Sequence, residues 1–556
     1  MRNSPIRKRS LPGRPEGRKT RRAAAQFSLA CLIFLVPAFA QNHANVTVDL
    51  GQKVNVLTDS SLGLPTSMSN ADCFSGAAIP WLRAAGISSL RFPGDRDLAD
   101  LYHWSTGATV PYKGGDLGFI APACNFARFA LSAEQLGQGV IVVNYGSNPN
   151  GTGGGEPEEA AAWVAYANGI PSDIHPLGKD STGRDWQTVG YWAALRSEAP
   201  LPKDDGLNFL RIRHPRPFGF HLWQVGDEVY NNGYYGDQHT GDPDLHAPAP
   251  ASPKDPGKLK GNPNLSPAAY AANFQRFAKA MKAVDPSIEV GAAFTVPPSP
   301  DPNSHDWAPD WDKEVLKRAC ADIDFVIFDW TLQPLLPPDW KTLDEASLLQ
   351  NQGYNQTNMI DLLLEPMLQD YKRYCPAGHL PRLAFDPVAI ATWVQVQHPV
   401  VEALWAADFY GLLIESGSAN IDWNEMYGDS MLSTNGGKPG PVFYGLQMLH
   451  IVAYRPGDML VDARSNSPVL AVHATRRRDG IVGLMLINKD PHSATEVKVT
   501  FRNGSVGTTG RRIEYGEAQF AAKSGPTVSA FSAPGDEFTV TVPAYTITDI
   551  LLPGRK

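Results

Sequence analysis

The sequence predicts an α/β protein, a (β/α)8 TIM barrel followed by an antiparallel β-sandwich domain. Three observations support this prediction. Short apolar runs rich in β-branched residues alternate with longer Ala- and Leu-rich segments of helical period, polar residues gather at the ends of the apolar runs, and strand-like runs continue without helices after Arg455-Pro456-Gly457. The 556 residues suffice for a large barrel and one smaller domain.

Residues 1–40 predict a secretory signal peptide that is not part of the fold. A basic region from Arg2 to Arg22 precedes an apolar run from Phe27 to Phe39, and the run ends in Ala38-Phe39-Ala40, a small-x-small cleavage signal. We therefore expect the leader to be cleaved and the mature protein to be secreted or periplasmic.

Residues 41–455 hold the predicted barrel. Its helix candidates include residues 79–85, 157–168, 267–284, 359–374 and 400–415. Its eight strand candidates are residues 54–62, 87–92, 140–145, 219–229, 288–295, 323–330, 382–386 and 419–426. Eight strands that lead into helices are what such a barrel requires, and its active groups lie at the carboxyl ends of the strands.

Polar residues stand at the ends of several of these strands, whereas a surface strand would spread them along its length. The most informative end follows the fourth strand, where the apolar run from His221 to Val225 leads into Asp227, Glu228 and Tyr230. A carboxyl group that neighbouring rings desolvate can have its pKa raised enough to donate a proton near neutral pH. The alternative is a strand end with two solvated acids.

Residues 456–556 predict the β-sandwich, because five strand candidates follow one another there without helices. The isolated apolar strand within residues 44–52 is a candidate to complete it. The five candidates are residues 470–474, 481–487, 495–501, 511–515 and 538–542.

Composition excludes several kinds of partner. The chain has a net charge of −8 and the leader alone +8, so the mature part carries about −16 and is a poor binder of nucleic acid. No stretch after the leader approaches the roughly 20 apolar residues of a membrane span. Cys73, Cys124, Cys320 and Cys375 permit one or two disulfides of unspecified pairing, and their spacing predicts no zinc site.

Six motifs in a fixed order resemble the bacterial α-L-arabinofuranosidase-like proteins of the clan A glycoside hydrolases. The motifs are Leu90-Arg91-Phe92-Pro93-Gly94, Asp100-x-Tyr102-His103-Trp104, Val143-Asn144-Tyr145-Gly146, Glu159 to Asn168, Val189 to Arg196 and Trp223 to Gly236. The resemblance covers nearly all of the mature chain. It implies a retaining glycosidase, with an acid/base Glu after strand four and a nucleophile Glu at the end of strand seven, about 5 to 5.5 Å apart.

Glu228 matches the acid/base position of that family. Asp227 stands where the family usually has Asn, so it can accept a hydrogen bond from a sugar hydroxyl but cannot donate one. At strand seven the chain reads Phe385-Asp386-Pro387, which aligns Phe385 with the nucleophile. Asp386 is the candidate substitute, although strand alternation points it away from the site unless the strand breaks at Pro387. The alternative for Asp386 is a structural or loop-capping role.

Further residues are candidates for substrate binding, each with a structural alternative. Arg91 and Asn144 bind hydroxyls or serve as a buried salt bridge and a turn cap. Tyr230 follows the acidic pair, and Asp329 stands where related chains carry His. Glu425 is a second strand-eight acid or a solvated loop charge. The aromatic candidates for stacking on sugar faces, or for packing in the core, are Trp104, Trp330 and Trp423.

Two functions are consistent with these residues. The first is a glycoside hydrolase that acts on arabinofuranosyl or related bonds of plant-type polysaccharides and needs no cofactor. The second is a carbohydrate-binding protein without catalysis, because the nucleophile Glu is replaced. The sequence does not specify the sugar, the linkage or the oligomeric state.

Overall fold

The computed structural model describes residues 42–66, 76, 78–94, 96–111, 124–236, 242–248, 259–295, 308, 310–331, 345–349, 356–389, 396–424, 426, 431–433 and 437–555. The predicted signal peptide, residues 1–40, lies outside the described residues, and so does Glu425.

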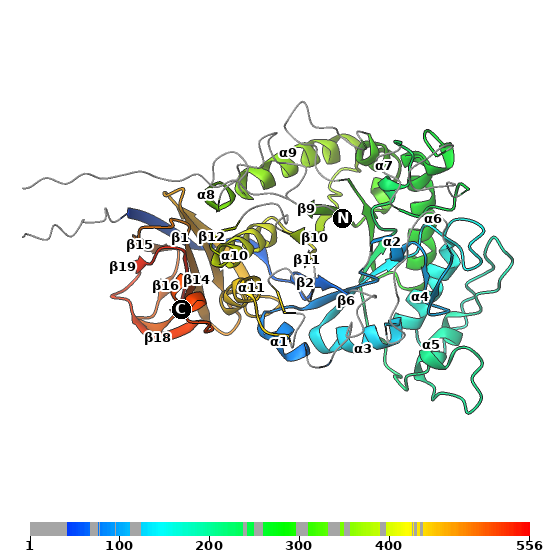
Figure 1. Cartoon of the computed structure of the whole chain (residues 1–556), viewed down its shortest axis with the longest axis horizontal. Coiled ribbons are helices and arrows are strands. Elements are labelled where there is room, and N and C mark those ends of the chain that lie inside the picture. Colours follow the sequence, from blue (N-terminus) through cyan, green and yellow to red (C-terminus); the bar gives the residue numbers. More distant parts are fainter. Residues whose placement is uncertain are drawn as a thin grey trace, which may run out of the picture. The chain divides into compact units, whose positions relative to one another are not determined.

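Eight parallel strands close into a barrel, as predicted (Figure 1). In chain order they are β2 (Gly63–Pro65), β3 (Ser89–Phe92), β6 (Gln138–Val143), β7 (Leu222–Val225), β8 (Glu289–Ala293), β9 (Phe325–Thr331), β10 (Arg382–Ala389) and β11 (Asn420–Trp423), and β11 pairs with β2 to close the ring. The strand Leu222–Val225 is therefore the fourth of the barrel and Arg382–Ala389 the seventh.

The first barrel strand is not the one that the sequence predicts. Residues 54–56 end a different strand, β1 (Asn42–Val56), which belongs to the C-terminal sheet, and the barrel strand β2 begins only at Gly63. The β-branched Val54 and Val56 favour a strand, whereas β2 has three residues and includes Gly63 and Pro65, which have low strand propensity. Propensity therefore directed the prediction to the wrong segment.

One layer inside the barrel is apolar. It forms a cluster separate from the main core and is built from β6, β7, β9, β10 and the residue before β11: Val140, Leu222, Phe325, Ile327, Ala384 and Ala419. Alternate residues of a strand face opposite sides, so the strand neighbours of this layer face the surrounding helices. The layer thus fixes which side chains point inward at the strand ends.

The helices around the barrel begin where the sequence provides caps. Side chains of Asn125, Thr188 and Ser266 each accept the N–H of the third residue onward. The helices are α1 (Ile79–Ala84), α3 (Phe126–Leu136), α4 (Pro157–Asn168), α5 (Val189–Ser197), α6 (Pro267–Val284), α7 (Trp311–Ala319), α8 (Glu345–Leu349), α9 (Gln356–Tyr374), α10 (Val400–Glu415) and α11 (Pro441–Val452). After β3 the chain also forms the short helix α2 (Arg96–Ala99) and a hairpin of β4 (Tyr102–His103) and β5 (Ala108–Thr109).

The C-terminal part is a single ten-stranded sheet, so the predicted β-sandwich is not confirmed. Strand β1 pairs with β12 on one side and with β15 on the other, and this joins the strands into one continuous sheet. The short helix α12 (Glu517–Ala521) lies between β17 and β18. The other strands are β12 (Met459–Ser465), β13 (Leu470–Arg476), β14 (Ile481–Asn488), β15 (Thr495–Arg502), β16 (Ser505–Val506), β17 (Thr509–Gly516), β18 (Thr527–Ser532), β19 (Glu537–Val542) and β20 (Thr546–Arg555).

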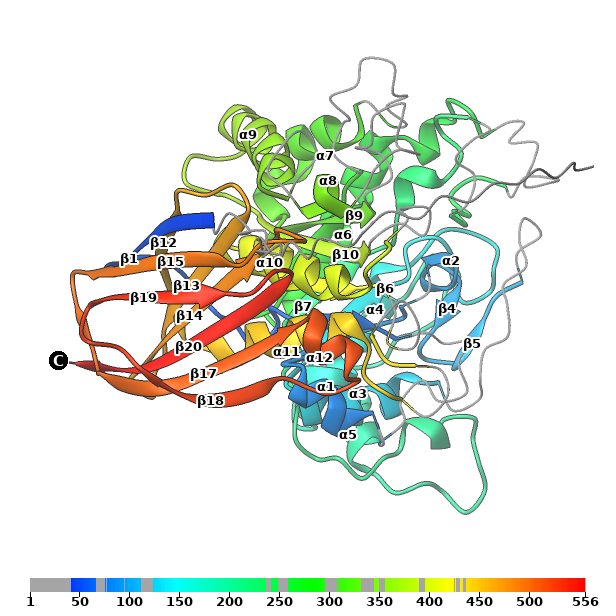
Figure 2. The same cartoon turned by 60° about the vertical axis from the view of Figure 1, so that its left-hand side comes forward.

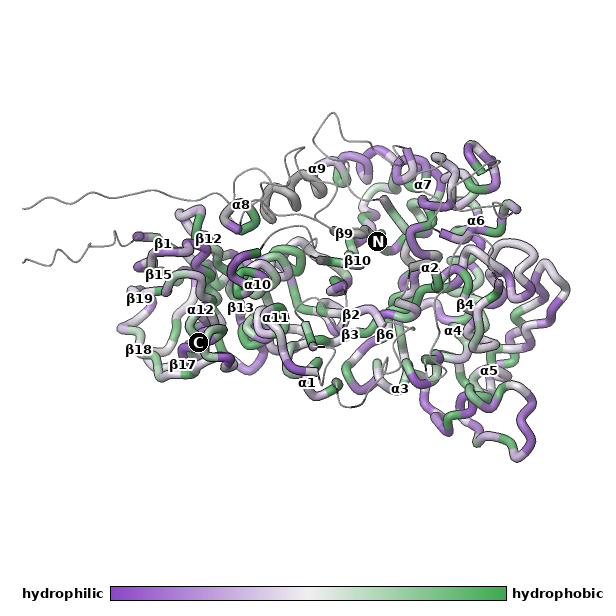
Figure 3. The backbone as a smooth tube through the Cα atoms, in the orientation of Figure 1, coloured by the Kyte–Doolittle hydropathy of each residue, from purple (hydrophilic) through white to green (hydrophobic). Residues whose placement is uncertain are grey.

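Helices α10 and α11 lie between the barrel strands and this sheet (Figures 1 and 2). The α10 helix contacts β1 and β13, and α11 contacts β14, β17 and β20. Hydrophobic stretches run through both the barrel and the sheet (Figure 3), and each has its own buried apolar cluster.

Buried charges also cross this boundary. Asp408 of α10 accepts from Nε2 of His473 in β13 at 3.0 Å and forms an ion pair with Lys489, while Nδ1 of His473 contacts Glu415 at 2.8 Å. Asp408, His473 and Lys489 are all buried. The helix α10 and the sheet are therefore held together by a network of opposite charges as well as by apolar contacts.

One disulfide within the described residues joins Cys320 to Cys375 and links the segment after α7 to the end of α9. Cys124 is also disulfide-bonded. No helix in the described part of the chain combines the length and the hydropathy that a membrane span requires.

Candidate active site

Arg91 lies at the centre of a buried group of polar side chains at the carboxyl ends of the barrel strands. It is the third residue of β3 and is 1% exposed. Its Nη2 donates to Oε1 of Gln224 at 3.0 Å and to Oδ1 of Asp227 at 2.7 Å, and its Nη1 forms an ion pair with Oδ2 of Asp386. The guanidinium therefore joins the ends of the second, fourth and seventh barrel strands.

Asp386 points into the barrel, which corrects the orientation expected from the sequence. In the structure Ala384 belongs to the inner apolar layer, so Asp386, two residues further along, faces the same side. Phe385 instead packs in the main core, where it stacks on Phe328 at a centroid distance of 6.1 Å. The register of β10 also shifts after Phe385, next to Pro387. The inward position at this strand end is therefore held by a carboxyl group.

Asp422 is a buried neighbour of this group that sequence reasoning missed. It is the third residue of β11, is 0% exposed, and interacts electrostatically with Arg91 and Asp386. Its carboxyl group lies directly over Gly63, where an added Cβ would come within 1.8 Å of Oδ1. Neither carboxyl oxygen has a hydrogen-bond partner among the described residues. Its place near the end of the eighth barrel strand was the available signal.

The two aspartates have raised pKa values. Burial raises the pKa of Asp422 to about 7, although the charge of Arg91 opposes the shift. Burial also raises the pKa of Asp386 well above its ordinary value of 3.8; Arg91 lowers it, and the negative charges of Asp422, Asp227 and Glu228 raise it. One guanidinium therefore does not compensate all the carboxyl groups around it.

Glu228 follows β7 and lies within electrostatic range of Asp386. Its backbone adopts φ 42° and ψ 31°, a left-handed conformation that residues other than glycine rarely adopt, directly before the 3-10 helix η2 (Val229–Asn231). Its Oε2 accepts from Nδ2 of Asn231 at 2.8 Å. The fold thus brings the acid/base candidate and the nucleophile candidate to one region, from the fourth and seventh barrel strands.

Asp100 fixes the backbone beside these residues. Its Oδ1 accepts the N–H groups of Tyr145 at 2.7 Å and Gly146 at 2.8 Å, and its Oδ2 accepts the N–H of Asp227 at 3.0 Å. Burial raises the pKa of Asp100 to about 7, although these three hydrogen bonds oppose the shift. The sequence showed Asp100 within a motif but gave it no role, because its partners lie 45 to 127 positions away.

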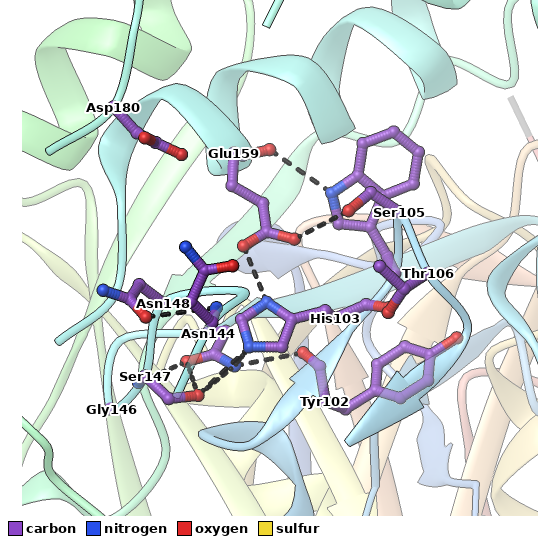
Figure 4. A network of polar contacts seen from close by, with 12 residues as sticks. Tyr102, His103, Ser105, Thr106, Asn144, Gly146, Ser147, Asn148, Glu159 and Asp180 are labelled. Carbon is purple, nitrogen blue, oxygen red and sulfur yellow. Dashed lines mark hydrogen bonds and ion pairs between the residues drawn. The ribbon is translucent and has the colours of Figure 1, made fainter. Parts of the chain in front are cut away.

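Asn144 belongs to a network of buried polar contacts outside the Arg91 group (Figure 4). Its Nδ2 donates to the carbonyl of Tyr102 at 3.1 Å and to Oγ of Ser147 at 3.1 Å, and its Oδ1 accepts the N–H of Ser147 at 2.8 Å. Nδ1 of His103 contacts Oε2 of Glu159 at 2.8 Å. Asn144 therefore caps a turn and ties the hairpin of β4 and β5 to the end of β6.

The contacts of this network follow one another as in a nucleophile–base–acid triad, but the network lacks the chemistry of a triad. Nε2 of His103 lies 3.2 Å from Oγ of Ser147, and its Nδ1 contacts Glu159. Ser147, however, is 0% exposed, and its hydroxyl donates to the carbonyl of Asp100 at 2.9 Å. A hydroxyl that is buried and whose proton is bound to a carbonyl is not placed to attack a substrate, so this cluster is structural.

Three aromatic candidates, Trp104, Trp423 and Tyr230, pack in the core. All three rings are at most 3% exposed. The ring centroids are 5.8 Å apart for Trp104 and Trp163, 6.1 Å for Trp423 and Trp405, and 6.3 Å for Tyr230 and Trp311. Asp329 and Trp330 lie in the last three residues of β9, but their side chains, like Glu425, lie outside the described residues.

No group of three or more His, Cys, Asp or Glu side chains in the described part of the chain is arranged to hold a metal ion. The Arg91 group contains one guanidinium, one amide, three aspartates and, within range of Asp386, Glu228.

The sequence matches no family model and no curated protein. Solved structures with a similar fold include the α-L-arabinofuranosidase of Thermotoga maritima in complex with arabinose, with a TM-score of 0.62, 16% identity, and coverage of 92% of this chain and 100% of that chain. The family 51 arabinofuranosidase of Xanthomonas axonopodis pv. citri is also similar, with a TM-score of 0.59, 17% identity, and coverage of 92% of this chain and 99% of that chain.

A Paenibacillus polymyxa xyloglucanase of glycoside hydrolase family 44 is also similar, with a TM-score of 0.56, 11% identity, and coverage of 92% of this chain and 100% of that chain. At such identities the similarity is one of fold. It extends over nearly the whole described chain, in agreement with the fold that the sequence motifs imply.

Proposed function

We propose that this protein is a secreted glycoside hydrolase that cleaves arabinofuranosyl or related bonds of plant-type polysaccharides with retention of configuration. The observation that carries the proposal is the placement of Glu228 and Asp386 after the fourth strand and within the seventh strand of one barrel, within electrostatic range of each other. The similarity in fold to arabinofuranosidases supports the choice of substrate class.

In the proposed mechanism Asp386 is the nucleophile. Arg91 pairs with its Oδ2, and among the described residues its Oδ1 has no hydrogen-bond partner. Oδ1 attacks the anomeric carbon while Glu228 gives its proton to the leaving oxygen, so that one carbon–oxygen bond forms as the glycosidic bond breaks. Glu228 then takes a proton from water, which attacks the same carbon and releases Asp386.

Specific observations favour a second candidate function, a carbohydrate-binding protein without catalysis. Asp386 is 7% exposed, and its pKa is raised. A protonated, buried carboxylic acid is a poor nucleophile. A protein with this site would hold a glycoside without breaking it.

Kinetics with aryl glycosides separate these functions. The mature protein should hydrolyse an aryl α-L-arabinofuranoside or another aryl glycoside, and Glu228→Gln and Asp386→Asn should each lower kcat/KM by about 100-fold or more. Aryl substrates with better leaving groups should partly rescue Glu228→Gln but not Asp386→Asn, since only the former loses the proton donor. If a broad panel is inert while soluble arabinan or xylan still retards the protein in gels, the binding function is correct.

A further inference from the structure

The Arg91 group contains more negative charge than its single cation balances. Asp227 and Asp386 form ion pairs with Arg91, and these residues and Asp422 are at most 7% exposed. Strands β10 and β11 pair with Ala384 opposite Asn420, two residues before Asp386 and Asp422. Water does not screen charges at such depth, and an unpaired ionised carboxyl group there costs several kcal/mol. If all three aspartates were ionised, the four side chains would carry a net charge of −2.

The hydrogen-bond donors in the group are unequally shared. Oδ1 of Asp227 accepts from Nη2 of Arg91 at 2.7 Å and from Nε2 of Gln224 at 3.1 Å. Asp386 has Arg91 at one oxygen. Neither oxygen of Asp422 makes a hydrogen bond of standard geometry among the described residues, and of the side-chain donors only the nearby amide of Asn420 favours its ionisation. A carboxyl group with few donors gains least from ionisation, so a proton in this group resides on the side of Asp422 and Asp386.

We propose that Asp422 is a positioning residue that shares one proton with Asp386 and thereby sets the pH at which Asp386 becomes an ionised nucleophile. The kinetic part of this inference rests on the proposed function. The sharing of the proton is a property of the folded protein alone.

Other groups that face the two aspartates do not take over this role. The hydroxyl of Tyr410, on α10, interacts electrostatically with both, and burial followed by the charges of Asp422 and Asp386 raises the pKa of Tyr410 well above 10.0, so it stays neutral. Arg91 stays charged. Asp227 and Glu228 add negative charge near Asp386, which favours retention of the proton. The raised pKa values of Asp422 and Asp386 agree with a coupled pair that loses its protons in two steps.

The test is the variant Asp422→Asn in the full-length mature protein. The substitution keeps the shape of the side chain and removes a negative charge next to Asp386, so Asp386 should ionise at lower pH. The acidic limb of the pH profile of kcat/KM should move down by about one pH unit or more. Asp422→Glu should keep the wild-type profile if it is active, because it retains the charge.

Asp549→Asn is the matched control. Asp549 is also fully buried, neither of its oxygens has a hydrogen-bond partner among the described residues, and it lies in β20. Its substitution should leave the acidic limb where it is. An unchanged limb in Asp422→Asn, or an equal shift in Asp549→Asn, would overturn the inference.

Infrared absorption of protonated carboxyl groups tests the shared proton without any substrate. At about pH 6, difference spectra of the wild type against Asp422→Asn and against Asp386→Asn should each show the loss of one buried protonated carboxyl component. The absorption of Asp100 and Asp549, whose pKa values burial also raises, should stay constant. Loss of that component in a protein that is inert toward all glycosides supports the shared proton and refutes only the proposed function. Difference spectra that show no such loss in either variant refute the inference.

If Asp422→Asn does not fold, titration of the wild type decides. Raising the pH should remove intensity from the protonated carboxyl band, and Asp386→Asn should abolish one step of this loss while the step of Asp100 remains. A step that is unchanged in Asp386→Asn would show that the two groups titrate independently, contrary to the inference.

Discussion

At the scale of single residues, buried side chains with several partners determine the geometry of the site. Asp100 shows this most clearly, because one carboxyl group accepts N–H groups at the ends of two barrel strands and so positions the backbone of Asp227, next to Glu228. An isosteric amide cannot accept at both ends.

Asp100→Asn should therefore place an amide NH2 opposite a backbone N–H. We expect the free energy of unfolding to fall by about 1 to 3 kcal/mol, the cost of an unsatisfied buried group. Chemical denaturation measures the change. Asp185→Asn is the control, because Asp185 accepts the N–H of Gln187 in an exposed turn. Loss of this hydrogen bond should change the free energy of unfolding little. Equal effects of the two substitutions would contradict this role of Asp100.

The sequence predicted part of this residue-scale picture. Arg91, Asp227 and Glu228 were selected because they stand at strand ends, and Arg91 and Asp227 do meet. The inward direction of Asp386 was missed, because an alignment to a family motif does not reveal which face of a strand is inside. That face is set by the contact of Ala384 with residues from other strands. Asp422 was missed because its neighbours Gly63 and Arg91 are distant from it in sequence.

At the scale of elements, the first residue of β2, Gly63, has no room for a side chain. An added Cβ at Gly63 would lie 1.8 Å from Oδ1 of Asp422 and 2.6 Å from Oγ of Ser89. Only glycine fits there while Asp422 holds its place. The glycine that weakened the strand prediction is thus required by the site.

Gly63→Ala should push Asp422 away from Arg91 or separate β2 from its neighbours. We expect a loss of about 1 to 3 kcal/mol in the free energy of unfolding, as for other overpacked cores. Thermal unfolding compares it with Gly535→Ala, whose added Cβ would meet nothing within 4 Å. If Gly63→Ala is as stable as Gly535→Ala, the carboxyl group of Asp422 does not lie as close to Gly63 as described.

The other elements were predicted with unequal success for physical reasons. The helices α4, α6 and α10 are rich in Ala and begin after Glu156, Ser266 and Pro399, and their predicted bounds agree with the structure. The sandwich was not confirmed, because the pairing of β1 with both β12 and β15 joins the strands into one sheet. Local patterns identify strands but not such distant pairing.

At the scale of the whole molecule, buried ions connect α10 of the barrel to the C-terminal sheet. Burial disfavours a charge on His473, but Glu415 and Asp408 raise its pKa to about 10. Burial would raise the pKa of Asp408, but Lys489 and His473 lower it to about 2. Both residues are therefore charged at neutral pH and attract each other.

These shifts determine how stability depends on pH. The contribution of His473 is complete below its ordinary pKa of 6.5 and is lost as the pH rises through about 10. The contribution of Asp408 is complete above its ordinary pKa of 3.8 and is lost as the pH falls through about 2. We therefore expect this network to stabilise the fold most between about pH 4 and 6.5.

Asp408→Asn tests the network. The variant removes the buried carboxylate that Lys489 and His473 share, so the free energy of unfolding at pH 7 should fall by about 3 to 5 kcal/mol. Its stability should also depend less on pH between about 7 and 10 than that of the wild type. Asp462→Asn, which breaks the exposed pair with Arg464, should cost less than about 1 kcal/mol. Calorimetry that finds equal costs for the two variants would contradict the account.

The most direct test of the proposed hydrolysis is to trap its covalent intermediate. The mature protein would be incubated with a 2-deoxy-2-fluoro glycoside that carries a good leaving group, digested, and its peptides sequenced by mass spectrometry. The account predicts a single glycosyl adduct on Asp386, absent from Asp386→Asn. An adduct on a different carboxylate, or turnover of ordinary glycosides by Asp386→Asn at the wild-type rate, would contradict it.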